Sequence, residues 1–120
     1  MYRRDNLMGR INDLINALAV IMVKITNRQE QEALAVIDEH LDIALLHAYA
    51  DGHDEQPDET LVKVQLDLLY LKTMLTALQQ EPGVPSLKQL WERAIVKFEQ
   101  ANKATLHYDL IEKKERISRL

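Results

Sequence analysis

The side chains with the most potential for metal chemistry lie between residues 38 and 47. His40 and His47 are seven residues apart, with Asp38, Glu39 and Asp42 beside them. On one continuous helix, this spacing would place both imidazoles on about the same side. A di-iron bundle needs Glu-x-x-His pairs on two helices and a zincin needs His-Glu-x-x-His, and the sequence contains neither motif. We therefore interpret these residues as a helix surface, with a small metal- or ligand-binding enzyme that uses them as the alternative.

A second group of acidic residues suggests calcium, because carboxylate oxygens are its preferred ligands. The group consists of Asp51, Asp54, Glu55, Asp58 and Glu59. An EF-hand loop needs a glycine at its sixth position and a glutamate at its twelfth, whereas Gly52 would fall second in a loop that starts at Asp51. We interpret this segment as a solvated loop.

The motifs of nucleophilic and phosphoryl-transfer catalysis are absent from the sequence. There is no cysteine, no glycine-rich phosphate loop and no Gly-x-Ser-x-Gly motif. The sequence has two serines: Ser86 suits a helix cap and Ser118 lies in the polar C-terminal segment. We therefore predict a non-enzymatic protein with no catalytic, cofactor-binding or metal-binding residues.

The basic segment "KKERISRL", residues 113–120, raises the question of nucleic-acid binding. Its positive charges are matched by Glu112 and Glu115, no aromatic residues alternate with them, and the whole chain carries a net charge of -4. A solvated helix face is the preferred interpretation, and a nucleic-acid-associated regulator that uses this segment is a weaker alternative.

Charge is unevenly distributed along the chain. Residues 29–60 hold ten acidic residues and no Lys or Arg, whereas residues 1–28 and 82–120 each carry a net charge of +3. A block without basic residues cannot neutralise a phosphate backbone. We expect the acidic block to attract the basic segments, within one molecule or between two.

Hydrophobic periodicity predicts helices throughout the chain. A first helix is expected from about Asp5 to Ile25, with one apolar stripe formed by Leu7, Ile11, Leu14, Ile15, Leu18, Ile21, Met22 and Ile25. A second is expected to follow an N-cap at Asn27, with Glu30 as its capping-box partner, and to run to roughly Tyr49. Its predicted buried face comprises Ala33, Leu34, Ile37, Leu41, Ala44, Leu45 and Ala48.

Turn residues separate the later helices. Gly52 is expected to end the second helix, and Pro57 suits the first turn of a third helix over about Asp58–Gln80. That helix has a stripe of Leu61, Val64, Leu68, Leu71, Leu75 and Leu78, widened by Val62, Leu66 and Leu69. Ser86, with Gln89, is predicted to cap a fourth helix with Leu87, Leu90, Trp91, Ala94, Ile95, Phe98 and Ala101 facing inward.

The C-terminal segment is predicted to be a fifth helix or an extension of the fourth. Acidic residues precede basic residues by four in the pairs Asp109–Lys113, Glu112–Arg116 and Glu115–Arg119, a spacing that stabilises helices. Leu106, Leu110 and Ile117 give this helix a narrow apolar edge for docking.

Two segments of the chain resemble the same known family. "EALAVIDEHL" and "RAIVKFEQA" are similar to the second helix of a tetratricopeptide-type hairpin, with Ala94, Phe98 and Ala101 at its spacing. In the first hairpin the third of these positions is His40, and Ala33 and Ala94 are 61 residues apart rather than one 34-residue repeat. The resemblance therefore implies a degenerate tetratricopeptide-like fold.

The first half of the chain also resembles a family of small bacterial proteins of unassigned function. Asp5, Leu7 and Ile11 match its helix entry, and a second matching segment contains Ala33, Leu34, Ile37 and Asp38. This resemblance implies a fold and no activity.

Together these patterns predict one all-α domain over residues 1–120, with two antiparallel helical hairpins and a C-terminal helix in a tetratricopeptide-like bundle. The charged N-terminal segment does not resemble a signal peptide, and the uncharged run from Leu14 to Val23 is shorter than the roughly 20 residues that span a bilayer. We expect a cytoplasmic interaction module that needs no cofactor. Its partner is a protein or peptide, in the first instance a second copy, because the wide apolar stripes of the first and third helices exceed what so few helices can cover.

Overall fold

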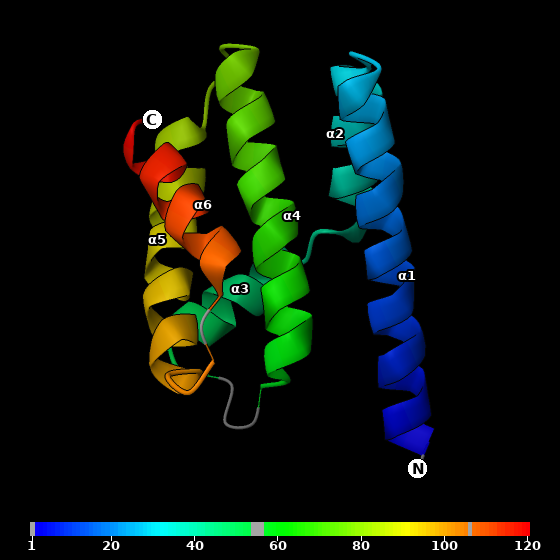
Figure 1. The fold of residues 1–120 in the computed structure, drawn as a ribbon, viewed down its shortest axis with the longest axis vertical. Helices are drawn as coiled ribbons and strands as arrows, with labels where there is room; N and C mark the ends of the chain where they lie inside the picture. The colour runs from blue at the N-terminus through cyan, green and yellow to red at the C-terminus, as the bar shows by residue number, and fades with distance from the viewer. Residues whose placement is uncertain (1, 54–56, 106) are drawn as a thin grey trace. The chain divides into compact units, whose positions relative to one another are not determined.

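The computed structural model describes residues 2–53, 57–105 and 107–120 and has six helices in this part of the chain. They are α1 (Tyr2–Thr26), α2 (Glu30–His40), α3 (Ile43–Ala50), α4 (Glu59–Leu78), α5 (Val84–Ala101) and α6 (Tyr108–Ser118) (Figure 1). The described residues contain no strand. The all-α prediction is therefore confirmed.

The chain divides into two compact units, residues 1–41 and 42–120. The first contains α1 and α2, and the second contains α3 to α6. The prediction that residues 1–120 form one domain remains a prediction, and the two units are described separately below.

The first unit is a helical hairpin. α1 ends at Thr26 with Arg28 in a left-handed conformation (φ 61°), where the amides of Arg28 and Gln29 donate to the carbonyls of Ile25 and Lys24. These two bonds satisfy carbonyls that the end of a helix leaves unpaired. Ala33 and Ile37 of α2 are buried, as are Ile11, Leu14, Ala17 and Ile21 of α1.

The predicted N-cap of the second helix is wrong. Asn27 lies in the turn directly after α1, where its amide donates to the Val23 carbonyl, and α2 begins after Gln29, which makes no side-chain cap bond. Because the chain reverses direction at Arg28, Gln29 is the residue that directly precedes α2 and occupies its N-cap position. The acidic first turn with Glu30 and Glu32 is confirmed, and Lys24 forms an ion pair with Glu32 at 3.4 Å between Nζ and Oε2.

The second predicted helix is broken in two. Leu41 and Asp42 have non-helical backbone angles, and α3 starts at Ile43 with the Asp42 carboxylate accepting from the Leu45 amide at 3.0 Å. The Asp42 amide donates in turn to Oε1 of Gln65, a side chain of α4 that is buried. A cap and a tertiary hydrogen bond thus replace the helical bonds that the break removes.

Replacing Gln65 with methionine is expected to destabilise the second unit by about 1–3 kcal/mol, because the Asp42 amide would lose its acceptor. Urea denaturation followed by circular dichroism measures the change. Leu68→Met, at another buried position of α4, removes no hydrogen bond and is the matched control. Equal losses in the two variants would show that the bond to Asp42 contributes nothing.

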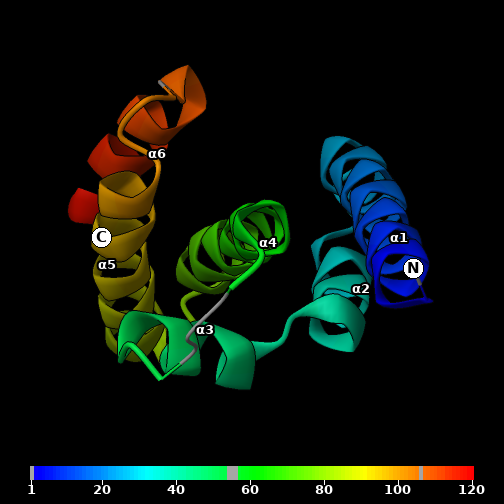
Figure 2. The same cartoon turned by 90° about the horizontal axis from the view of Figure 1, so that it is seen from below.

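The second unit packs α3, α4, α5 and α6 as a bundle. α4 and α5 form a hairpin, α3 lies crosswise on one side of this pair, and α6 covers the other side (Figures 1 and 2). α4 is buried around most of its circumference, including Leu61, Val62, Val64, Leu66, Leu68, Leu69 and Leu75. The expectation of an uncovered apolar stripe is therefore wrong for most of α4, although Leu71 is half-buried and Leu78 is exposed.

The residues that begin and end the helices of the second unit were predicted only in part. Gly52 ends α3 with φ 75°, and its amide and that of His53 donate to the carbonyls of Tyr49 and Ala48. Asp58 caps α4, its carboxylate accepting from Leu61, so Pro57 precedes the cap rather than lying in the first turn. The cap predicted at Ser86 is wrong: α5 begins at Val84 after Gly83, and Pro85 occupies its first turn.

Most predicted inward-facing residues of α5 and α6 are buried. Leu90, Trp91, Ala94, Ile95 and Phe98 are buried, whereas Leu87 is half-buried and Ala101 is exposed. α5 ends at Ala101 and α6 starts at Tyr108, which decides between a separate helix and an extension. Leu110 and Ile117 are buried, and Leu106 lies outside the described residues.

The end of α4 contains a residue in an unfavourable backbone conformation. Gln80 has φ 57°, and the amides of Gln80 and Glu81 donate to the carbonyls of Ala77 and Thr76. Left-handed geometry costs a residue with a Cβ atom about 1–2 kcal/mol. Gln80→Gly removes this strain from the folded chain. Glycine also adds conformational freedom to the unfolded chain, which offsets part of the effect, so we expect the free energy of unfolding to rise by about 0.5–1 kcal/mol.

Thermal and urea denaturation of Gln80→Gly would measure this gain. The control compares Gln79→Gly with Gln79→Ala, because Gln79 has φ -88° and glycine in place of alanine there adds only unfolded-state freedom. A loss of stability in Gln80→Gly would contradict the prediction.

Candidate functional site

The most extensive exposed apolar surface of the first unit lies on α1. Five large apolar side chains of this helix are each about half exposed, the fractions being 52% for Met8, 48% for Ile15, 47% for Val20, 50% for Met22 and 59% for Val23. Ile15 and Met22 were predicted to be buried, and this is wrong. Scattered exposed apolar residues are ordinary, but a contiguous group on one helix marks an interaction surface.

Helical spacing places part of this group on one ridge. Ile15, Ala19 and Val23 follow one another at intervals of four, and Met22 lies beside Val23 three residues after Ala19. Residues at these intervals lie next to each other on a helix surface. We call these four residues the α1 ridge. The buried residues of α1, such as Leu14 and Ile21, lie on a neighbouring side of the helix.

The small side chain of Ala19 leaves a hollow next to the ridge. This hollow has a volume of about 310 Å³ and is lined by Ala19, Val20, Val23, Lys24 and Gln29. Its lining is mainly apolar, with one cationic side chain at the edge. Such a surface suits an aliphatic side chain of a partner, and it offers no set of converging polar groups for chemistry.

The helix break overturns the geometric argument for a histidine site. His40 ends α2, and His47 lies in α3, so the two are not on one continuous helix. Nδ1 of His40 lies 2.9 Å from the carbonyl of Val36 in its own helix, and His47 is exposed. Within the described ranges, no group of three or more His, Cys, Asp or Glu side chains is arranged to hold a metal ion.

The acidic residues that were considered as calcium ligands take separate structural roles where the structure describes them. Asp51 forms an ion pair with Arg93 of α5, and Asp58 caps α4. Glu59 accepts hydrogen bonds from the Tyr49 hydroxyl at 2.9 Å and the Asn102 amide at 3.1 Å. Asp54 and Glu55 lie outside the described residues.

The Tyr49 side chain links the Glu59 carboxylate to the core of the second unit. Burial and the hydrogen bond to the Glu59 carboxylate both raise the pKa of its hydroxyl above the ordinary value, because each opposes formation of a phenolate. The Lys97 ammonium lies 5.8 Å from the centre of the Tyr49 ring. The tyrosine is therefore a protonated donor that ties α3 to the start of α4.

The basic C-terminal segment is paired with acidic side chains. Three ion pairs within α6 confirm the predicted spacing: Asp109–Lys113, Glu112–Arg116 and Glu115–Arg119. Lys114 reaches Glu99 of α5 at 3.0 Å. These bonds engage Lys113, Lys114, Arg116 and Arg119 within the chain, which supports a solvated helix face over a phosphate-binding surface.

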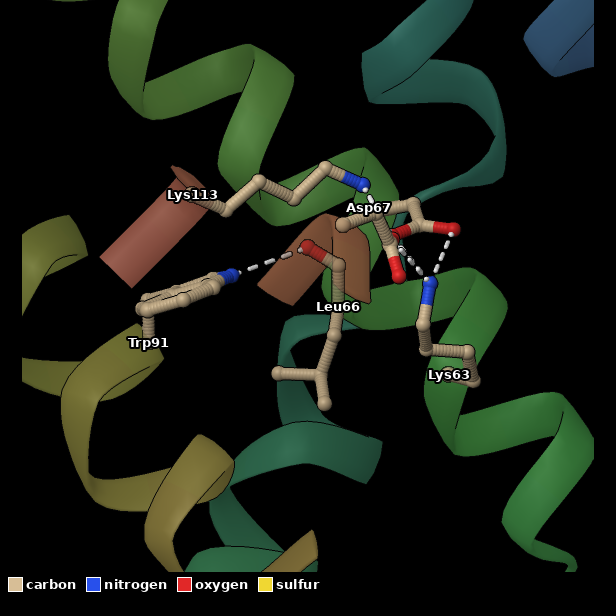
Figure 3. Close-up of polar contacts among 6 residues, drawn as sticks. Lys63, Leu66, Asp67, Trp91 and Lys113 are labelled. Carbon is tan, nitrogen blue, oxygen red and sulfur yellow. Dashed lines mark hydrogen bonds and ion pairs between the residues drawn. The ribbon is translucent and has the colours of Figure 1, made fainter. Parts of the chain in front are cut away.

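A four-residue ion network joins α4 to α6. Lys63 and Lys113 each donate to the Asp67 carboxylate (Figure 3) and also to the Asp109 carboxylate, with Nζ–O distances of 2.8–3.0 Å. We call these residues the ion quartet. The sequence predicted only the pair within α6, although Lys63 and Asp67 also lie four residues apart.

The ion quartet shifts the pKa of two of its members. Partial burial would raise the pKa of Asp109, but hydrogen bonds from Lys63 and Lys113 lower it to about 2. Burial would lower the pKa of Lys113, but hydrogen bonds to Asp67 and Asp109 raise it above its ordinary value. Because its charges balance, the quartet is suited to holding α6 in place rather than to transferring protons.

A shallower depression in the second unit lies where α3 ends beside α5. It has a volume of about 510 Å³ and is lined by Ala50, Gln89, Glu92, Arg93 and Val96. Arg93 is already paired with Asp51. The remaining lining lacks a nucleophile with an adjacent base, and the depression shows no catalytic arrangement.

Comparison with known proteins adds no relative: no family model, no curated protein and no solved structure matches the chain. No helix among the described residues is long and apolar enough to cross a membrane.

Proposed function

We propose that this protein is a non-enzymatic helical interaction module, and that the α1 ridge with its hollow is the surface that binds a protein partner. The observation that carries this proposal is the exposure of five large apolar side chains on one helix. An apolar helix face next to a hollow is the arrangement by which one helix packs its side chains against another.

The size of the exposed surface sets what the partner must provide. Burying a large aliphatic side chain completely contributes about 1.5–3 kcal/mol, so the half-exposed residues of α1 supply roughly 4–7 kcal/mol in total. Lost translational and rotational freedom costs about 4–15 kcal/mol. The partner must therefore bring a complementary apolar surface of its own.

The finer features of the fold belong to the same proposal. We propose that α1–α2 and α4–α5 are degenerate tetratricopeptide-like hairpins of a bacterial cytoplasmic protein. Burial of Ala33 and Ile37 in the first hairpin, and of Ala94 and Phe98 in the second, supports this relation. Exposure of Ala101 departs from the pattern, since the third position of the motif normally packs against the preceding helix.

Affinity capture from the native host, followed by mass spectrometry, tests the proposal. The double variant Ile15→Glu/Val23→Glu places two charges on the α1 ridge and is expected to lose the proteins that the unmodified chain captures, by at least about tenfold. The matched control Ser86→Glu/Gln100→Glu adds the same charge at exposed positions of α5 and should retain them. Identical capture by both double variants would overturn the proposal.

A further inference from the structure

The α1 ridge has a symmetry that points to a specific partner. Ile15 lies four residues before Ala19, and Val23 lies four residues after it. The row Ile15–Ala19–Val23 within the ridge therefore has a small residue at its centre and a branched side chain at equal distances on either side. The hollow, lined by Ala19, Val20 and Val23, lies at the Val23 end, whereas the Ile15 end provides a protruding side chain that is half exposed.

Rows of residues four apart form the ridges that most often pack in helix pairs, and a small residue at the crossing point allows close approach of the two backbones. If two copies cross at Ala19 in opposite directions, Ile15 of each copy lies over the hollow beside Val23 of the other. If they cross in the same direction, Ile15 meets Ile15 and the two hollows face each other unfilled. Filling the hollows therefore favours the antiparallel arrangement.

We propose that two copies of this chain associate through their α1 helices, which cross antiparallel at Ala19 with Ile15 of each copy in the hollow of the other. This inference rests on the proposed function, because it names a second copy as the partner of the α1 ridge. Such a contact is isologous, so it closes as a dimer without further growth. A single helix crossing buries less than about 1,200 Å² and belongs to the class of weak, reversible interfaces.

Disulfide cross-linking tests the crossing directly, because the sequence contains no cysteine and any introduced thiol is the only one present. A disulfide needs Cα atoms about 4.4–6.8 Å apart. At the antiparallel crossing the two Ala19 residues meet. The two Ile15 residues are separated by eight residues along the helices, about 12 Å at 1.5 Å per residue.

Under mild oxidation at tens of micromolar protein, we expect Ala19→Cys to form a covalent dimer rapidly. Ile15→Cys and Val23→Cys should each form little dimer alone and should link to each other when mixed. Asp13→Cys, at an exposed position of α1 away from the ridge, is the control and should form little covalent dimer. Rapid self-linking of Ile15→Cys and of Val23→Cys would overturn the antiparallel crossing in favour of a parallel one.

Sedimentation of the unmodified chain and of Ile15→Glu/Val23→Glu separates this inference from the proposed function. If the unmodified chain is a dimer and the double variant is a monomer, the result supports both the proposed dimer and the proposed function. A monomeric unmodified chain that still captures a host protein through the α1 ridge overturns the second copy as partner and leaves the proposed function standing. A monomer that captures nothing overturns both. A monomer that is strongly destabilised by the two glutamates also overturns both, because the ridge would then be covered within its own chain.

Discussion

Trp91→Ala is expected to destabilise the second unit by about 3–5 kcal/mol, a large fraction of the stability of a small domain. Trp91 is 1% exposed, its ring lies 6.3 Å from that of Tyr70, and its Nε1 donates to the main-chain carbonyl of Leu66 at 3.1 Å (Figure 3). Alanine removes the ring and leaves a cavity between α4 and α5. The loss therefore combines the transfer free energy of the ring with the cost of that cavity.

Urea denaturation followed by circular dichroism measures this loss, since the variant lacks the only tryptophan for fluorescence. Trp91→Phe retains an aromatic ring and removes the hydrogen bond to Leu66, so it should lose a smaller amount, about 1–2 kcal/mol. Val96→Ala, at an exposed position of the same helix, is the control and should change the stability by less than about 0.5 kcal/mol. A Trp91→Ala variant as stable as this control would show that α4 and α5 are held together without the indole.

Many of the buried residues of α4 and α5 were predicted correctly from the sequence, for a simple reason. The apolar stripe of α4 and the inward face of α5 recur at helical spacing, and residues such as Leu68 and Phe98 are buried as that spacing requires. The spacing also predicted the ion pairs within α6, because partners four apart need only the helix itself. Contacts determined by one helix are therefore visible in the sequence.

The helix break at Leu41 and Asp42 could not be predicted in the same way. Leu41 and Asp42 lie in an apolar run that continues the helical period, and no Glu or Gln follows three residues after Asp42 to signal a capping box. At the break, Asp42 caps α3 by accepting from the Leu45 amide, and its own amide donates to the side chain of Gln65, which is 23 residues away. Tertiary hydrogen bonding of this kind has no local sequence signal.

The exposed residues of α1 were misplaced for a different reason. The prediction assigned all the apolar residues of the first helix to one buried stripe, although Ile15 and Met22 lie to one side of the row that contains Ile11 and Leu14. The first unit consists of α1 and α2, and a single helix covers one side of its neighbour. Ile11 and Leu14 are therefore buried, whereas Ile15 and Met22 are exposed.

Asp67→Ala is expected to destabilise the second unit by about 2 kcal/mol, between the cost of breaking a buried ion pair and that of an exposed one. The Asp67 side chain is 21% exposed and accepts from both Lys63 and Lys113 (Figure 3). Its removal leaves two partly buried ammonium groups that share the single carboxylate of Asp109. Urea denaturation near neutral pH measures the loss.

Asp109→Asn is the matched comparison within the ion quartet, because the Asp109 side chain is 47% exposed and water screens its interactions. We expect a loss below about 1 kcal/mol near neutral pH. If Asp67→Ala cost no more than Asp109→Asn, the partial burial of Asp67 would have no energetic consequence and the quartet would be an ordinary surface network.

The loss in Asp109→Asn should depend on pH in a defined direction. The pKa of Asp109 is about 2 in the folded chain, below its ordinary value of 3.8, so folding favours the carboxylate form. The stabilisation from this group is therefore complete above about pH 4 and declines as the pH falls toward 2. Urea denaturation of both proteins from pH 2 to pH 6 should show a difference in unfolding free energy that is constant at the upper end and shrinks at the lower end. A difference that grows on acidification would mean that the folded chain favours the protonated carboxyl, and that the bonds from Lys63 and Lys113 do not stabilise the charged form.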